Sequence, residues 1–312
     1  MADYHLDATD ANVHSDWDRD RDPVLTVAPG ETVSFDCLDA TGGQLDRDST
    51  PEDVVALDSD RIHAMTGPVA VEGAEPGDVL EVELRSLDHR GVGFQWFYPE
   101  EKGLLPEEFD DPGFFAWELE GDVGHFVDGI EVPLAPFPGN IGVAPATAGP
   151  HSTTPPRDVG GNLDVKHLTE GATLYLPVEM AGGLFSVGDC HAAQGDGEVC
   201  VTAIEAPMGV TCRFDVRSDF EIRQPQFSTS GPFTPTGADE SMYATTGVAD
   251  DLMDATKAAI SHMMDHIEDA HGLSRAHAYL LCSAIVDLKV SEVVNAPNWV
   301  VTAYLPDSVF PA

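Results

Sequence analysis

Basic side chains are scarce in this sequence. Its 312 residues include 15 Lys and Arg against 55 Asp and Glu, so the formal net charge is −40, and only four of the basic residues are lysines. Proteins that bind nucleic acid neutralise phosphates with Lys and Arg, so this composition argues against a nucleic-acid partner. The acidic residues are spread along the whole chain, as in halophilic proteins. In molar salt the repulsion between such residues is screened, because the Debye length falls to about 3 Å. The alternative is an acidic face that binds a cationic partner.

Long apolar runs are also missing. No stretch approaches the roughly 18 consecutive apolar residues of a membrane helix, and residues 1–18 have neither the basic nor the apolar segment of a signal peptide. We therefore expect a cytoplasmic protein with no membrane partner. The five cysteines are widely spaced and include no CxxC pair, which argues against a disulfide framework or a structural zinc module. Free, buried thiols are expected instead.

The apolar residues that are present, 42% of the chain, are enough for a folded core. Between residues 23 and 216, short apolar or alternating runs are separated by Gly, Pro and Asp, which predicts β structure. Residues 79–84, for example, alternate Val or Leu with Glu, as in a strand with one face in water. Residues 90–159 show few clear periods, and we expect them to form long ordered loops.

The pattern changes after about residue 224. Residues 250–270 place Leu, Met, Ala and Ile on one face of a predicted helix that Gly272 ends. Ser274 is expected to cap a second helix, and two strands should follow it. The sequence thus predicts a mainly β protein, with residues 1–223 as the catalytic scaffold and residues 224–312 as a smaller α+β part that contains a helix pair.

The densest polar cluster is residues 188–198, Gly-Asp-Cys-His-Ala-Ala-Gln-Gly-Asp-Gly-Glu. Asp189 and His191 are two residues apart, so in an extended segment they point to the same face and could bind one cation. The glycines allow a tight turn that returns Glu198 toward the same point. The alternative is an acidic turn on a halophilic surface.

Two further segments carry candidate site residues. Residues 155–164 form a proline-stiffened stretch leading into a glycine pair, whose accessible N–H groups could bind an anion while Asp164 adds a carboxylate. In residues 63–78, His63 precedes a Gly-Pro turn and Glu72 lies at a predicted strand end. Taken alone, His63 is more typical of a structural histidine than of a ligand.

In this order, the three segments resemble the acetamidase/formamidase family. The matching stretches are HAMTGPVAVEGAEPGDVLEVEL, FPGNIGVAPA, GPHSTTPPRDVGGNLDVKHLTEGATLYLPVEMAGGLFSVGDCHAAQGDGEVCVTAIE and, more loosely, ATTGVADDLMDATKAAISHM. The resemblance covers most of the chain. It implies hydrolysis of a short-chain amide, acetamide or formamide, to ammonia and the carboxylate. It also implies a jelly-roll-like β-sandwich with a smaller α+β part, and assembly into a homo-oligomer.

Hydrolysis of an unactivated amide requires an activated water and a stabilised oxyanion, both of which a divalent metal supplies. We expect Asp189 and His191 to bind this metal, with His63 as a further candidate ligand. Asp164 and Asp196 are expected to be ligands or partners that fix His191. Zn²⁺ suits the mixed imidazole and carboxylate set, whereas Ca²⁺ would suit a separate site made only of oxygen atoms.

The proton-transfer group is expected among the glutamates. Glu198 or Glu72 is the candidate general base, and Asn162 together with Gln194 would orient the amide. Cys190 stands beside a histidine and is the alternative nucleophile, but adjacent residues on a strand point to opposite faces.

Two other classes of function stay open at this point. One is a non-catalytic β-sandwich module whose Asp-rich turn holds a structural Ca²⁺. The other is a hydrolase of a different linear amide or of a cyclic amide. Assays of ammonia release from formamide, acetamide and propionamide separate these classes.

Overall fold

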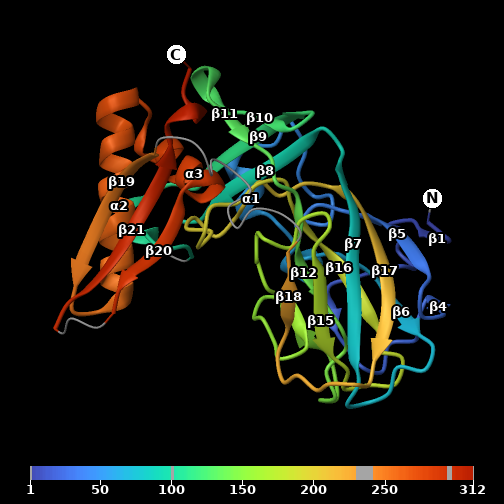
Figure 1. The fold of residues 1–312 in the computed structure, drawn as a ribbon. Coiled ribbons are helices and arrows are strands. Elements are labelled where there is room, and N and C mark those ends of the chain that lie inside the picture. The colour runs from blue at the N-terminus through green and yellow to red at the C-terminus, as the bar shows by residue number, and fades with distance from the viewer. Residues whose placement is uncertain (1, 100–101, 230–241, 294–296, 312) are drawn as a thin grey trace.

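The computed structural model describes residues 2–99, 102–229, 242–293 and 297–311 (Figure 1). Within these residues, 21 strands stand against three α-helices, which confirms the prediction of a mainly β protein. Among the helices in this part of the chain, none combines the length and the apolar character needed to cross a bilayer.

The first large sheet has six strands in the order β1-β5-β17-β7-β15-β18. Its strands are β1 (Tyr4–Leu6), β5 (Thr32–Cys37), β17 (Met208–Arg217), β7 (Val79–His89), β15 (Thr173–Pro177) and β18 (Gln226–Ser228). Buried and solvent-facing residues alternate along β5 and the first half of β7. This alternation confirms the strand with one wet face that the sequence predicted, since successive side chains of a strand point to opposite faces.

The second large sheet follows the order β14-β12-β16-β6-β2, with β4 paired to β6. Its strands are β14 (Gly160–Asn162), β12 (Phe137–Gly142), β16 (Phe185–His191), β6 (Met65–Val71), β2 (Val13–His14) and β4 (Leu25–Val27). Phe185 of β16 contacts Phe35 and Phe214 of the first sheet, with ring centroids 5.9 and 5.0 Å away. The two sheets therefore share one apolar core. This packing agrees with a β-sandwich, while the jelly-roll arrangement stays a prediction.

The region between residues 90 and 159 is not the set of long loops that the sequence suggested. It forms a four-stranded sheet in the order β11-β10-β9-β8, the strand β12, and the strand β13, which pairs with β3. The bounds are β8 (Val92–Phe97), β9 (Gly113–Glu120), β10 (Val123–His125), β11 (Glu131–Pro133), β13 (His151–Ser152) and β3 (Asp16–Trp17). Most residues of β8 and all of β12 are buried on both faces. Such strands show no polar alternation, so the loop prediction was wrong.

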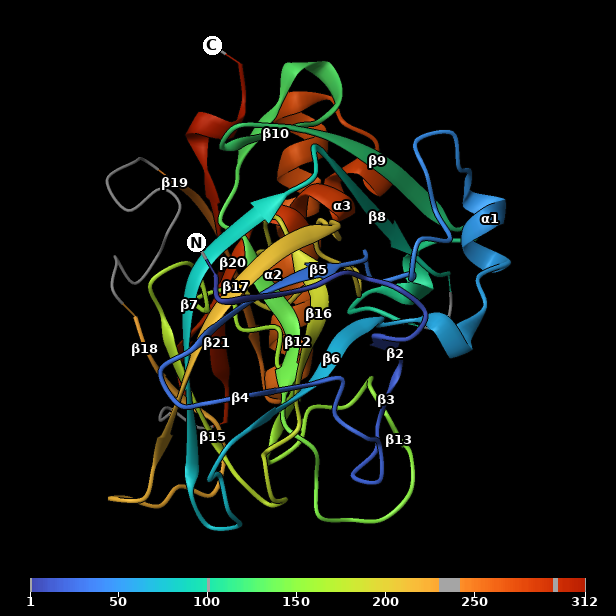
Figure 2. The same cartoon turned by 90° about the vertical axis from the view of Figure 1, so that its right-hand side faces the viewer.

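Short helices connect several of these strands. They are α1 (Pro51–Val55) and the 3₁₀ helices η1 (Ser59–Arg61), η2 (Pro106–Glu108), η3 (Val127–Gly129) and η4 (Asp307–Val309). Helix α1 lies beside β8 and β9 (Figure 2), where Val54 joins Phe94 and Trp96 in an apolar cluster separate from the main core.

The C-terminal elements include the helix pair and the two following strands that the sequence predicted, and one strand before the helices that it did not predict. They are α2 (Leu252–His271), α3 (Arg275–Ile285) and a sheet of order β19-β21-β20, with β19 (Met242–Ala249), β21 (Trp299–Pro306) and β20 (Asp287–Glu292). The Ser274 hydroxyl caps α3 at the His277 N–H, and Gly272 ends α2 in a left-handed conformation. This unit stands to one side of the large sheets in Figure 1, but β18 still belongs to the first sheet. The division at residues 223 and 224 stays a prediction.

Candidate active site

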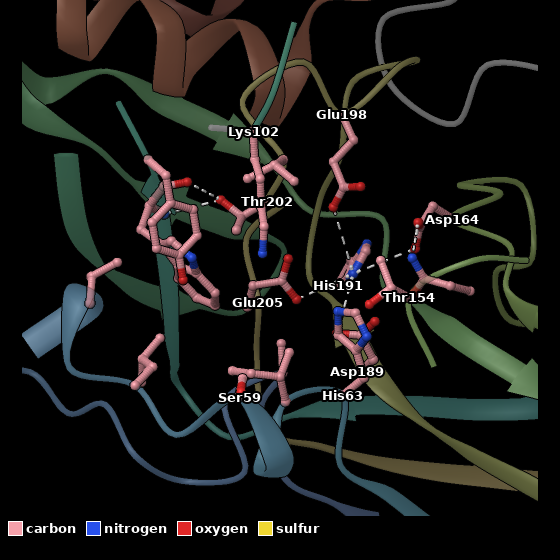
Figure 3. A pocket seen from close by; sticks show the side chains of 18 of the residues that line it. Ser59, His63, Lys102, Thr154, Asp164, Asp189, His191, Glu198, Thr202 and Glu205 are labelled. Carbon is pink, nitrogen blue, oxygen red and sulfur yellow. Dashed lines mark hydrogen bonds and ion pairs between the residues drawn. The ribbon is translucent and has the colours of Figure 1, made fainter. Parts of the chain in front are cut away.

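A cavity of about 270 Å³ opens where the end of β16 meets β8, the loop after β14 and the segment from α1 to η1 (Figure 3). Polar side chains cover one part of its lining and apolar side chains cover another. The polar and charged lining residues are Ser59, His63, Lys102, Thr154, Asn162, Asp164, Asp189, His191, Glu198, Thr202 and Glu205.

Four carboxylates surround the imidazole of His191. Its Nε2 lies 3.2 Å from Glu205 Oε2, 3.9 Å from Asp189 Oδ1, and 4.0 Å from both Asp164 Oδ1 and Glu198 Oε1. The carboxylates come from separate segments and approach His191 from different sides (Figure 3). Asp189 and His191 occupy the same strand two residues apart, so the structure brings this pair into one site as the sequence spacing predicted.

The orientation of His191 is set from behind the cavity. Its Nδ1 lies 2.8 Å from the amide oxygen of Gln194, and the Gln194 amide nitrogen donates to the backbone carbonyl of Asp164 at 2.9 Å. Because this second bond fixes which end of the amide faces His191, Nδ1 must carry the proton and donate. With the proton fixed on Nδ1, Nε2 is the nitrogen that faces the carboxylates and that would offer its lone pair to a metal ion.

The backbone around the cavity is strained. Seven non-glycine residues among those described have a positive φ, and five of them line this cavity. The five are His63, Asp164, Asp189, Glu198 and Val201. Each such residue costs on the order of 1–3 kcal/mol, and such costs concentrate at functional sites. The concentration here argues against a simple acidic turn at the protein surface.

The space between the acidic groups is kept clear by Gly139 of β12. A Cβ at this position would lie 2.7 Å from His191 Nε2 and 2.8 Å from Asp164 Oδ1. Asp164 Oδ1 and Glu205 Oε2 are also buried and have no hydrogen-bond partner among the residues that the structure describes. Donors bound to one tetrahedral Zn²⁺ at about 2.0–2.2 Å lie roughly 3.5 Å from one another, close to the distances in this cluster. The residues therefore fit a divalent metal ion.

The charges of the cluster oppose one another. Burial disfavours the charged form of His191, but Glu205, Asp189 and Glu198 outweigh it and raise its pKa well above the usual range. Burial likewise works to raise the pKa of Asp189, yet the positive charges of His63 and His191 and its hydrogen bonds lower it to about 2. The site thus favours positive charge at its centre.

The pKa values of two other carboxyls are raised, in contrast to that of Asp189. Burial raises the pKa of Asp164 to about 7, against the charge of His191 and with the help of Asp189 and Glu205. Burial, followed by the charge of Asp164, raises the pKa of Glu198 well above its usual value. A carboxyl of raised pKa can accept and return a proton near neutral pH.

The structure places some of the candidate residues elsewhere. Glu72 is exposed at the end of β6, where its N–H donates to the Val27 carbonyl, and it does not line the cavity. Asp196 turns away from His191 and forms an ion pair with Lys166 at 3.6 Å. The reason is that Gly197 and Glu198 reverse the chain after Asp196, so only Glu198 returns to the site.

The two amides also have other partners than expected. Gln194 lies behind His191 and outside the cavity lining, so it positions the imidazole rather than an amide substrate. Asn162 lines the cavity, but its Nδ2 donates to Asp164 at 2.9 Å and its Oδ1 accepts from Asn140 at 3.0 Å. His63 lines the cavity as well, with Nδ1 3.2 Å from the Thr153 hydroxyl.

The cysteines are free and buried, as the sequence predicted. Cys190 belongs to the main core and does not line the cavity. Its contact with Cys37, together with burial, raises the pKa of the Cys190 thiol well above the usual range. A thiol of this kind is a poor nucleophile.

Sequence reasoning missed Glu205. It is the carboxylate nearest to His191, and it follows residues 199–204, which are apolar except for Thr202, in an irregular segment that pairs with Phe94. A single acid within an apolar run was the available signal, because a buried carboxylate is costly unless it is paired or binds a metal. Thr154 and Lys102 also line the cavity and were not predicted to do so.

Comparison with known proteins agrees with this geometry. The sequence pattern of the Acetamidase/Formamidase family matches residues 2–152 and 146–312. The chain belongs to this family. The family and its named relatives show that the chain is an amidase that acts on linear amides, as the sequence motifs indicated. This finding rejects the alternative of a non-catalytic calcium-binding module.

Individual relatives cover nearly the whole chain. A formamidase from Methylophilus methylotrophus is 27% identical over 96% of this chain and 90% of its own length. A solved γ-lactamase from Delftia acidovorans has a TM-score of 0.89 and 28% identity, and covers 98% of this chain and 91% of that chain. An acetamidase structure from Bacillus halodurans has a TM-score of 0.69 and 31% identity, with 97% of each chain covered.

Proposed function

We propose that this family member hydrolyses a short-chain aliphatic amide, formamide or acetamide, with water activated by a divalent metal at His191. The observation that carries the proposal is the convergence of four carboxylates within 4.0 Å of His191 Nε2, two of them with a buried oxygen that has no hydrogen-bond partner in the described part of the chain. His191, Asp189 and Glu205 are the most deeply buried of the candidate ligands, and Asp164 completes the set. Zn²⁺ suits this mixture of imidazole and carboxylate.

When bound, the metal supplies Lewis acidity that activates water and polarises the amide carbonyl. The protein supplies proton transfer and orientation. Glu198 takes a proton from the attacking water as its oxygen bonds to the carbonyl carbon. Glu198 then returns this proton to the nitrogen as the C–N bond breaks, so ammonia and the carboxylic acid leave, and the acid gives its proton to solvent to become the carboxylate. Gln194 holds the imidazole of His191, and Asn162 holds the carboxylate of Asp164.

The proposal is tested by ammonia release from formamide, acetamide and propionamide, together with metal analysis of protein purified in salt. We expect ammonia release and about one metal ion per chain. His191→Ala should lower both the metal content and the activity, because one of only three or four ligands is lost. His151→Ala is the matched control, since His151 lies outside the cavity lining. Full activity of the His191→Ala protein, or full activity without metal, would overturn the proposal.

The γ-lactamase similarity favours a second candidate, which is hydrolysis of a cyclic amide. Ring opening uses the same steps, except that the nitrogen stays attached to the product and no ammonia is released. The assay for this candidate therefore follows loss of a γ-lactam by chromatography. Turnover of the lactam without ammonia release from any linear amide would replace the first candidate by the second.

A further inference from the structure

The cavity is larger than the proposed substrates need. Its volume is about 270 Å³, and a water molecule's share of the liquid is about 30 Å³, so the space equals roughly nine water molecules. Acetamide takes up roughly the volume of three. A formamide or acetamide molecule at His191 would leave more than half of the cavity to water.

The space beyond His191 is lined by apolar side chains. Val54, Val55, Leu57 and Ile62 from the α1–η1 segment and Trp96 of β8 belong to the lining, and Val54, Leu57 and Trp96 pack in one apolar cluster. In Figure 3, His63, Asp164, Asp189, His191 and Glu198 lie together in one half of the view, and Glu205 and Lys102 lie near its middle. The cavity is therefore divided into a polar end, where a carboxamide would react, and an apolar wall.

The apolar wall has its own support in the fold. Val54 and Trp96 are 1% and 4% exposed and belong to the small apolar cluster beside α1, whereas His191 rests against Phe137 of the main core. The Trp96 backbone is fixed at both its N–H and its carbonyl by the Thr202 hydroxyl, at 3.0 and 2.7 Å. The wall is thus preformed, and an apolar group placed against it gains binding free energy without reorganising the protein.

We propose that the cavity accepts primary amides with an apolar acyl chain of about four to six carbons, which pack against the apolar wall while the carboxamide lies at His191. This inference rests on the proposed function, because it assigns the acyl side of the same reaction. Val55, Leu57 and Trp96 are its specificity-determining residues. The reaction is unchanged: water's oxygen joins the acyl carbon, the C–N bond breaks, and the nitrogen leaves as ammonia.

The first test is a series of linear primary amides, from formamide and acetamide through butyramide to hexanamide. We expect kcat/KM to rise about fourfold per methylene, and so on the order of a hundredfold between acetamide and hexanamide. A kcat/KM that is highest for formamide or acetamide would overturn the inference and leave the proposed function standing. Absence of ammonia release from every amide in the series would overturn both.

The second test changes the wall. Val55 is 66% exposed, so Val55→Asp should fold, and it should lower the ratio of kcat/KM for hexanamide to that for acetamide about tenfold. Leu57→Ala should lower the ratio several-fold. Val248→Asp is the matched control, because Val248 is 58% exposed on β19 and away from the cavity. Damage to the fold would lower kcat/KM for hexanamide and for acetamide together and would leave their ratio unchanged. An unchanged ratio in both Val55→Asp and Leu57→Ala would refute the role of the wall.

Discussion

The side chain of Glu198 differs from those of Glu205 and Asp164 in its hydrogen bonds. Glu205 accepts a hydrogen bond from the Ala203 N–H at 2.9 Å, and Asp164 accepts one from Asn162. Glu198 contacts His191 from the loop side of the cavity, and burial raises its pKa well above the usual value. No donor among the described residues fixes this carboxyl, and its raised pKa allows it to accept a proton and return it, so Glu198 suits proton transfer better than ligation.

Glu198→Gln is therefore expected to keep the metal and the fold but to lower kcat by roughly 10²–10⁴, the usual contribution of a positioned proton-transfer group. Steady-state kinetics and metal analysis on the same sample check this. Asp196→Asn is the matched control, since Asp196 lies in the same turn but outside the cavity, and its kcat should stay within a few-fold of wild type. A Glu198→Gln protein that lost its metal would instead make Glu198 a ligand.

At the scale of elements, β16 connects the core to the site. Phe185 packs between the two large sheets at its start, and Asp189 and His191 enter the cavity at its end. Its Ser186 hydroxyl lies 2.9 Å from Nε2 of the buried His14, while His14 Nδ1 lies 2.8 Å from the Asp16 carbonyl. The carbonyl can only accept, so Nδ1 donates to it. In the neutral imidazole Nε2 then accepts from the hydroxyl, so both ring nitrogens have a partner without a charge on His14.

This arrangement predicts a dependence of stability on pH. Burial, with the charge of Arg21, lowers the pKa of His14 to about 4 in the folded chain, against about 6.5 in the unfolded chain. Between these values the unfolded chain binds a proton that the folded chain does not. His14 should therefore contribute on the order of 3 kcal/mol that is present above about pH 6.5 and is lost as the pH falls toward about 4.

Urea unfolding of wild type and His14→Gln across this range checks the prediction. The variant should be less stable at neutral pH, and the difference in the free energy of unfolding should shrink as the pH falls. A difference that stays constant from about pH 7 to about pH 4 would show that His14 is not buried in its neutral form.

A second contact between elements joins the turn at residues 194–198 to the C-terminal unit. The Lys166 ammonium donates to Asp287 of β20 and lies 3.6 Å from Asp196. The side chains of Lys166 and Asp287 are only 6% and 8% exposed. Removing one member of a buried pair leaves the other charge uncompensated, which is costly.

Lys166→Met should therefore lower the free energy of unfolding by about 3–5 kcal/mol. The double variant Lys166→Met with Asp287→Leu should recover most of this loss, because no unpaired charge is then buried at Asp287. Arg21→Met is the control, since its ion pair with Asp16 is about one third exposed and its loss should cost about 1 kcal/mol or less. Denaturant unfolding at constant salt measures all three variants. A double variant no more stable than the single one would argue against the charge as the cause.

At the scale of the whole molecule, charge is the dominant property. The net charge of −40 opposes the folded state in dilute buffer, because folding brings like charges closer together. Arg275 illustrates how the few cations are used: it forms ion pairs with Glu108, Asp265 and Glu268 at once. Adaptation to high salt and assembly into a homo-oligomer both stay predictions.

We expect the thermal midpoint to rise by about 10 °C or more between about 0.05 M and about 2 M KCl, because the Debye length falls over this range. Differential scanning calorimetry checks the rise, and light scattering on the same samples gives the oligomeric state. Sucrose is the control, since it favours compact states without screening charge. Full stability in dilute buffer would contradict the halophilic interpretation.

The sequence by itself determined the features that depend on neighbouring residues. The helices over 252–271 and 275–285 follow from periodicity and from the caps at Asp251 and Ser274. The placement of Asp189 and His191 in one site follows from their spacing on a strand. The family follows from motifs that lie within continuous stretches.

Only the tertiary structure decided the features that depend on distant segments. Strands buried on both faces, such as β8 and β12, carry no alternation from which a sequence could reveal them. Glu205 reaches His191 because its segment pairs with the end of β16, where His191 and Glu205 form an antiparallel bridge, and the same residue also pairs with Phe94, 111 positions away in the chain (205 − 94 = 111). Glu72 and Asp196 had suitable chemistry for the site, but the chain turns them elsewhere. Residue type limits which groups can act in the site, whereas packing between distant segments decides which of them meet.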